Sequence, residues 1–332
     1  MHSSALPFTA TKPRLSFSST GIRLAILCAF LLVSVTLFLT WNVKASWAFT
    51  LEYRGMKLLS LVIVGASISI ATLLFQTICG NRILTPGIMG FDSMYILIQT
   101  ILIFSLGSVG FSSMSPYLKW ALETAVMLGC VLLLAWMLFR GTSQSLHYLI
   151  LVGIIFGVLF TSLSYLFSRM LDPTQFSVLQ DSMFASFGSV DPALLLISGF
   201  VFTATALFLF RIHAELDVML LGRQSALNLG VDFSRRTLQT LFVTVVLIAL
   251  STALVGPVSF FGLLVAHLTY RLCGSYKHGI MIPFATVLGI LTLVSGEFVL
   301  QHLLSFQTRL SIIIEFIGGV FFLVLIIRQG KA

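Results

Sequence analysis

Charged residues are scarce in this chain, and that scarcity limits what kind of protein it can be. Only 9% of its 332 residues are Asp, Glu, Lys or Arg, while 58% are hydrophobic and the mean hydropathy is +1.06. Soluble domains carry roughly 25% charged residues, so most of this surface does not face water. The net charge of +8 is spread thinly over the ends of apolar segments, which argues against a basic patch for nucleic acid.

Paired cysteines, nucleotide-binding loops and linkers are also lacking. The four cysteines have no paired spacing, so no disulfide framework, metal site or cofactor is expected. No phosphate-binding loop of the GxxxxGK type occurs. The chain is therefore not expected to be an enzyme, and any ATP hydrolysis must take place on another chain. No Gly/Ser-rich linker or charge run divides the sequence, which indicates a single domain over residues 21–332 after a polar tail at residues 1–20.

Charge-free stretches long enough to cross a bilayer recur along the whole chain. A spanning helix needs about 20 apolar residues, and a helix satisfies its own backbone hydrogen bonds in lipid. The sequence therefore predicts an all-α, polytopic membrane protein with about ten transmembrane helices. They are expected near residues 22–41, 58–79, 91–108, 118–139, 147–168, 192–211, 237–255, 259–272, 279–298 and 310–327. The eighth is too short for a comfortable span, which indicates a partial or re-entrant helix.

The basic residues favour one orientation of this bundle. An even number of helices places both termini on one side, and cytoplasmic termini put thirteen of the nineteen Lys and Arg residues on the inner side. That asymmetry agrees with the positive-inside rule. The tail at residues 1–20 then lies in the cytoplasm. The weakly amphipathic segment 170–190 is expected as a short helix at the external membrane surface.

A polar segment at residues 216–236 interrupts the hydrophobic helices and is the most informative stretch of the chain. It contains arginines, acids and two glycines, so it cannot lie in hydrocarbon. It must face water or a partner protein. Its apolar residues Leu221, Ala226, Leu229 and Val231 indicate a surface that packs against something. The simpler alternative is a solvated cytoplasmic loop.

Glycine and proline break two further stretches of the chain. Proline removes a backbone donor and glycine allows close approach, so neither stretch continues as one helix. The later break is interpreted either as a tight turn at the membrane surface or as a gate-adjacent broken helix that lines a cavity. The earlier one is interpreted either as a simple loop between helices or as a packed re-entrant connection near the cytoplasmic mouth. The residues concerned are Gly256, Pro257 and Gly262 in the later break, and Asn81, Pro86, Gly87 and Gly90 in the earlier one.

These segments together resemble the permease family of type II ABC importers, which take up iron–siderophore complexes, haem and vitamin B12 into bacteria. The resemblance covers nearly the whole chain from Arg54 to Arg328. The stretch GPVSFFGLLVAHLTYRL is similar to GPIGFVGLVVPHLARLL of the family, and LGRQSALNLGVD is similar to its coupling helices. Gln76 and Asn81 match the Q-x4-N that opens another family motif. The pattern is most like the branch for ferric catecholate or mixed siderophores of the petrobactin and anguibactin type.

The resemblance implies a fold like that of the vitamin B12 permease, in the bacterial cytoplasmic membrane. It implies a second permease, identical or homologous, two ATPase subunits and an extracytoplasmic siderophore-binding protein. Import of vitamin B12 or haem is an alternative, as is an ion-coupled secondary transporter. The family's ATPase-coupling role would fall on Leu221, Gly222, Arg223, Ala226, Leu229 and Gly230, and docking of the binding protein on Arg54 and Lys57.

The remaining candidate residues are ionisable groups near the motifs. His267 is expected to be hydrogen-bonded inside the bundle, because no second His, Cys or carboxylate stands at metal-ligand spacing. For Glu297 a structural ion pair is favoured over contact with substrate, since charge within a membrane is costly when unpaired. For Arg54 and Lys57 the alternative to docking is ordinary snorkelling of long basic side chains to the interface.

Overall fold

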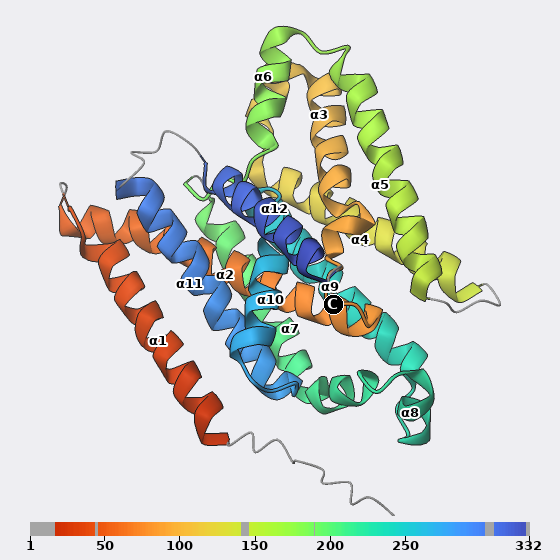
Figure 1. Ribbon diagram of the computed structural model, residues 1–332. Coiled ribbons are helices and arrows are strands. Elements are labelled where there is room, and N and C mark those ends of the chain that lie inside the picture. The colour runs from red at the N-terminus through yellow and green to blue at the C-terminus, as the bar shows by residue number, and fades with distance from the viewer. Residues whose placement is uncertain (1–16, 44–45, 141–145, 189, 303–308, 330–332) are drawn as a thin grey trace, which may run out of the picture.

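The computed structural model describes residues 17–43, 46–140, 146–188, 190–302 and 309–329, and every regular element in these ranges is a helix (Figure 1). The tail expected at residues 1–20 lies outside them except for its last residues, which begin α1. The elements are α1 (Phe17–Thr40), α2 (Trp47–Cys79), η1 (Pro86–Met89), α3 (Phe91–Ser113), α4 (Pro116–Arg140), α5 (Leu146–Ser168), α6 (Pro173–Ser182), α7 (Pro192–Met219), α8 (Arg223–Asn228), α9 (Phe233–Val255), α10 (Phe261–Leu272), α11 (His278–His302) and α12 (Leu310–Gln329).

Each of the ten long helices expected from the sequence overlaps one helix of the structure. Seven of the described helices are long and apolar enough to cross a membrane, namely α1, α2, α3, α5, α7, α9 and α11. The expected short eighth helix is α10, which has 12 residues. At 1.5 Å per residue it spans about 18 Å, which is less than the roughly 30 Å hydrocarbon core.

Several helix ends differ from the expected boundaries for reasons visible in the structure. Helix α2 begins at Trp47, so Arg54 lies inside it. The carboxylate of Asp232 accepts a hydrogen bond from Arg235 N at 3.1 Å, and this N-cap starts α9 before residue 237. Among the described residues of the segment 170–190, only those of α6 are helical, and a capping box between Asp172 and Gln175 sets its start.

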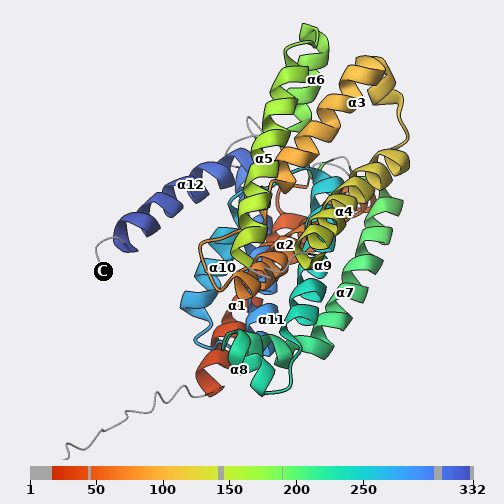
Figure 2. The ribbon, with the colours of Figure 1, turned by 90° about the vertical axis from the view of Figure 1, so that its right-hand side faces the viewer.

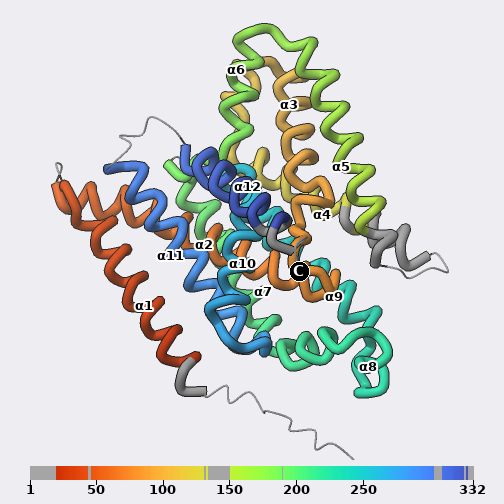
Figure 3. The backbone as a smooth tube through the Cα atoms, in the orientation of Figure 1, coloured from red at the N-terminus to blue at the C-terminus, as the bar shows by residue number. Residues whose placement is uncertain are grey.

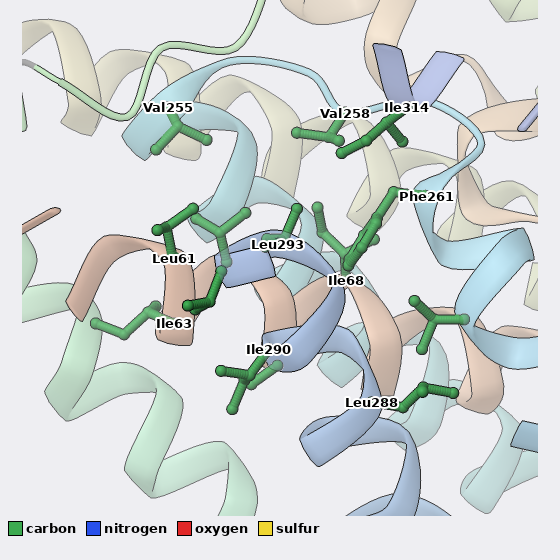
Figure 4. Close-up of a cluster of buried hydrophobic side chains, with 14 of the residues drawn as sticks. Leu61, Ile63, Ile68, Val255, Val258, Phe261, Leu288, Ile290, Leu293 and Ile314 are labelled. Carbon is green, nitrogen blue, oxygen red and sulfur yellow. The ribbon is translucent and has the colours of Figure 1, made fainter. Parts of the chain in front are cut away.

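Helix α2 forms the centre of the bundle, where it packs against α9, α11, α10 and α7. Figure 4 shows one part of this core, where side chains of α2, α9, α10, α11 and α12 interlock. Leu61, Val64 and Leu73 of α2 are fully buried, as are Phe261 and Leu293 of its neighbours. In lipid such contacts stabilise the bundle through close van der Waals packing.

Helices α2 and α11 approach closely because glycines face each other. An ideal Cβ placed on Gly289 of α11 would lie 2.7 Å from Gly65 O of α2, so no larger residue fits at this position without displacing a helix. Polar contacts join the same helices at both ends. Lys57 Nζ lies 2.5 Å from Glu297 Oε1, with side chains only 8% and 3% exposed. At the other end, Thr77 Oγ1 lies 2.8 Å from His278 Nε2.

Removal of one partner of the Lys57–Glu297 pair should destabilise the bundle. In Glu297→Ala, the Lys57 ammonium stays buried and loses this carboxylate, and breaking a buried pair costs about 3–5 kcal/mol. We expect a clearly lower apparent melting temperature for the detergent-solubilised protein. The double variant Lys57→Met, Glu297→Leu should recover most of the loss, because an apolar pair replaces both charges.

The matched control is Gln301→Ala, which removes a weaker 3.3 Å contact to Glu297 and should change the melting temperature little. A Glu297→Ala protein as stable as the wild type would contradict this account of the pair.

Candidate functional site

The candidate coupling segment connects α7 to α9 at the end of the bundle opposite α6 (Figures 1 and 2). Figure 3 traces it as a loop that leaves the bundle after α7 and returns at α9. At its centre is the six-residue helix α8, which begins at Arg223. Gly222 and Gly230 flank α8 with φ of 89° and 82°. Side chains rarely tolerate such positive φ values, so both turns require glycine.

The residues of α8 and of the turns that flank it differ in how exposed they are. Ala226 is fully buried, and its carbonyl accepts a hydrogen bond from Val231 N at 2.9 Å. Leu221, Leu227 and Leu229, in contrast, are 61%, 53% and 62% exposed. Clustered leucines on a polar segment indicate a protein contact. Five of the six expected coupling residues are therefore exposed, and Ala226 alone of the six is buried against the bundle.

An ion pair joins the end of α7 to the start of α9, the two helices that α8 connects. Arg236 of α9 forms a two-pronged ion pair with Glu215 of α7. Its guanidinium also donates to Gln239 Oε1 at 2.8 Å. Bidentate Arg–carboxylate pairs are geometrically specific as well as strong. The pair keeps the end of α7 and the start of α9 together.

The two glycine–proline breaks meet inside the bundle. Helix α2 ends at Cys79 and the chain passes through η1 into α3, while α9 ends before Gly256 and the chain becomes helical again at α10. Ser259 Oγ from the second break donates to Asp92 Oδ2, at the start of α3, at 2.9 Å. A cavity of about 390 Å³ lies between them, and Pro86, Gly87, Gly262 and Phe322 of α12 are among its lining residues. Both breaks thus border the same cavity, and the functional role of their residues stays a prediction.

Gln76 and Asn81 shape the turn that follows α2. Gln76 Nε2 donates to the carbonyl of Arg82 at 2.7 Å. Asn81 Oδ1 accepts from the backbone N–H two residues further on, at 3.0 Å. The Arg82 guanidinium lies over the rings of Tyr270 and Tyr276, 4.7 and 5.4 Å from their centroids. These cation–π contacts hold the turn against the end of α10. Gly90 (φ 84°) then joins η1 to α3.

Gly256 and Pro257 end α9 beside the segment that follows α6. Gly256 has a φ of 102°, and the last carbonyl of α9 accepts from Ser186 N at 2.8 Å. This corner borders a second cavity of about 830 Å³. The buried carboxylate of Glu123 lines that cavity and accepts from Gln99 Nε2 at 2.5 Å.

The expected docking pair, Arg54 and Lys57, makes contacts within the bundle. Arg54 Nη1 donates to the carbonyls of Phe38 and Trp41 at 2.9 Å each, so it binds the carbonyl end of α1. Lys57 is buried against Glu297. Glu297 thus has an ion-pair partner in Lys57, and docking of a binding protein on Arg54 and Lys57 stays a prediction.

His267 packs its ring edge-on against Phe321 of α12, with centroids 5.4 Å apart. Within the described part of the chain this aromatic contact takes the place of the expected hydrogen bond. Among the same residues, no group of three or more His, Cys, Asp or Glu side chains could hold a metal ion.

Four polar residues of this region were not singled out from the sequence: Asp92, Ser259, Asp217 and His278. Asp92 and Asp217 did carry a signal, because acids within apolar helices are rare and usually have a function or a partner. Ser259 and His278 gave no comparable signal, since their partners lie far away in the sequence.

Long apolar helices, two broken segments around a cavity and an exposed coupling segment define a multi-pass membrane transport protein. The chain belongs to the FecCD transport family, whose model matches residues 17–328. It is 39% identical to the petrobactin import system permease protein YclO of Bacillus subtilis, over 94% of this chain and 98% of the relative. It is 33% identical to the petrobactin import system permease protein FatC of Bacillus anthracis, over 83% of this chain and 78% of the relative.

The fold is also similar to a solved structure. A metal-chelate type ABC transporter in an inward-facing conformation superposes with a TM-score of 0.79 at 24% identity, covering 93% of this chain and 99% of that chain. At this level of identity the likeness establishes the fold.

Thiol labelling can check the orientation of α8. In a cysteine-free background, Leu229→Cys should react rapidly with a maleimide in the solubilised protein, because Leu229 is 62% exposed. Ala226→Cys is the matched comparison, and it should react slowly because Ala226 is fully buried. Equal rates at the two positions would show that α8 does not present the leucine face.

Proposed function

We propose that this chain is the transmembrane permease of an ABC importer that carries ferric siderophores across the bacterial cytoplasmic membrane. ATP hydrolysis takes place on separate subunits, and this chain performs no catalysis. The observation that carries the proposal is the α8 segment, a leucine-bearing helix suspended between two glycine turns. A partner that grips α8 can move the ends of α7 and α9 together, because Arg236 and Glu215 join them.

The substrate class is supported by the relatives. Two permeases named for petrobactin import are 39% and 33% identical to this chain, whereas a vitamin B12 permease of Vibrio cholerae is 27% identical. We therefore place a ferric siderophore of the petrobactin type, a catecholate or mixed chelate, ahead of vitamin B12 or haem.

The proposed topology has ten transmembrane helices and cytoplasmic termini. It adds α4, α12 and, as a partial span, α10 to the seven helices that length and composition already mark. It places α8, the turn after α2 and most of the arginines in the cytoplasm, in agreement with the positive-inside rule. It places α6 and the aromatic residues Trp41 and Trp47, which are 54% and 55% exposed, at the outer interface. Tryptophans are enriched in such interfacial belts.

The proposed assembly contains two permeases, identical or homologous, two ATPase subunits and an extracytoplasmic siderophore-binding protein. For the binding protein, Arg54 is the better contact of the predicted pair, because Lys57 lies buried against Glu297. Asp181 and Arg309, an exposed pair between α6 and the start of α12, lie at the same end. The transport pathway is proposed to run past the cavity between η1, α10 and α12.

A charge on the leucine face of α8 should uncouple this permease from its ATPase. Leu229→Glu places a carboxylate where an apolar contact is proposed, and the loss of a hot-spot residue in an interface costs about 2 kcal/mol or more. We expect ATP-dependent uptake of ferric petrobactin to fall roughly tenfold or more, with normal amounts of protein in the membrane.

The conservative variant Leu229→Met keeps the apolar surface and should retain uptake near the wild-type level. Full uptake by Leu229→Glu would show that α8 is not the coupling element.

A further inference from the structure

A polar cluster lies where the coupling segment leaves α7, and it lines neither of the two cavities described above. Asp217 comes from the last turn of α7, just before α8. His278 is the first residue of α11, and Thr77 lies near the end of α2. The His278 side chain is 1% exposed. Three helices thus meet at one imidazole.

The backbone N–H and both ring nitrogens of His278 have hydrogen-bond partners. Asp217 Oδ1 accepts from His278 N at 2.6 Å and from His278 Nδ1 at 2.7 Å. An ionised carboxylate only accepts, so Nδ1 carries a hydrogen. On the opposite side of the ring, Nε2 lies 2.8 Å from Thr77 Oγ1.

The Thr77 hydroxyl allows this contact to persist when the imidazole gains or loses a proton. Thr77 Oγ1 is also 2.9 Å from Leu73 O in its own helix. With a neutral ring, the hydroxyl donates to Nε2 of His278. With a protonated ring, Nε2–H donates to Oγ1 and the hydroxyl turns to Leu73 O.

We propose that Asp217, His278 and Thr77 form a positioning element that transmits movement of the coupling segment to α11 and α2. The inference rests on the proposed function, since it needs an ATPase that moves α8. When the end of α7 is displaced, the two short bonds to Asp217 must either break or carry the start of α11 along.

The surrounding contacts favour movement of α11 with α7 over breakage of the bonds to Asp217. Hydrogen bonds to a carboxylate are stronger than those between neutral groups, and breaking them would leave Asp217 without two donors. Helix α11 cannot move far without α2, because Gly65 and Gly289 are in close approach and Lys57 bonds Glu297 at the far end. The Arg236–Glu215 pair, in contrast, joins only α7 and α9.

The test compares transport with ATP hydrolysis in the complete importer reconstituted in liposomes with ferric petrobactin. For Asp217→Asn and Thr77→Val, we expect an ATPase rate within about twofold of wild type. The amount of substrate imported per ATP hydrolysed should fall by about fivefold or more, the usual scale of coupling between two sites. Asp217→Glu keeps the carboxylate and should retain most of the wild-type ratio.

Thr244→Val is the matched control, because Thr244 is buried and donates to Thr240 O in its own helix; its ratio should stay at the wild-type value. If Asp217→Asn and Thr77→Val lower ATPase rate, uptake and melting temperature in parallel, the cluster is only a structural clamp and the inference is overturned. An unchanged ratio in both variants overturns it as well. If the wild-type importer shows no ATP-driven uptake, the proposed function fails instead.

Discussion

The close approach of α2 and α11 is the constraint on which the rest of this structure depends. Gly65 and Gly289 bring the two backbones together, and no larger residue fits between them without displacing a helix. The Lys57–Glu297 ion pair and the Thr77–His278 contact then join the two helices near their opposite ends. In lipid, packing and buried polar contacts replace the hydrophobic effect as the source of helix association. Because α2 also touches α7, α9 and α10, this pair sets the positions of the helices around it.

In the proposed mechanism the coupling segment and the two broken segments move, and each of them contacts the α2–α11 pair at a different place. The coupling segment reaches it through Asp217, at the end of α7. The two broken segments reach it through α10, which packs on α2, and they are tied to each other by Ser259 and Asp92. Helix α2 therefore connects α8, where the ATPase is proposed to act, with the cavity beside η1. In this mechanism the two broken segments rearrange locally around the cavity, while α2 and α11 keep their positions relative to each other.

Much of the fold could be predicted from the sequence, because long charge-free runs leave few alternatives to helices. The start of α2 was missed because Glu52, Arg54 and Lys57 resemble a polar loop, whereas the structure gives the two basic residues partners on α1 and α11. The polar segment between α7 and α9 could be located in the chain, since arginines and glycines interrupt apolar helices there, and its coupling role stays a prediction. The inward direction of Ala226 and the Asp217–His278 contact depend on residues brought together by folding, and a single sequence does not reveal such pairs.

The most direct test of this account measures whether α2 and α11 move as one body. Spin labels at Leu59→Cys and Val299→Cys, both on exposed positions of these helices, report their separation in the assembled importer. A second pair, Leu59→Cys with Leu227→Cys on α8, reports movement of the coupling segment. Between the nucleotide-free and the ATP-bound states, the account predicts an unchanged distance distribution for the first pair and a shifted one for the second. A shift between Leu59 and Val299 as large as that between Leu59 and Leu227 would contradict it.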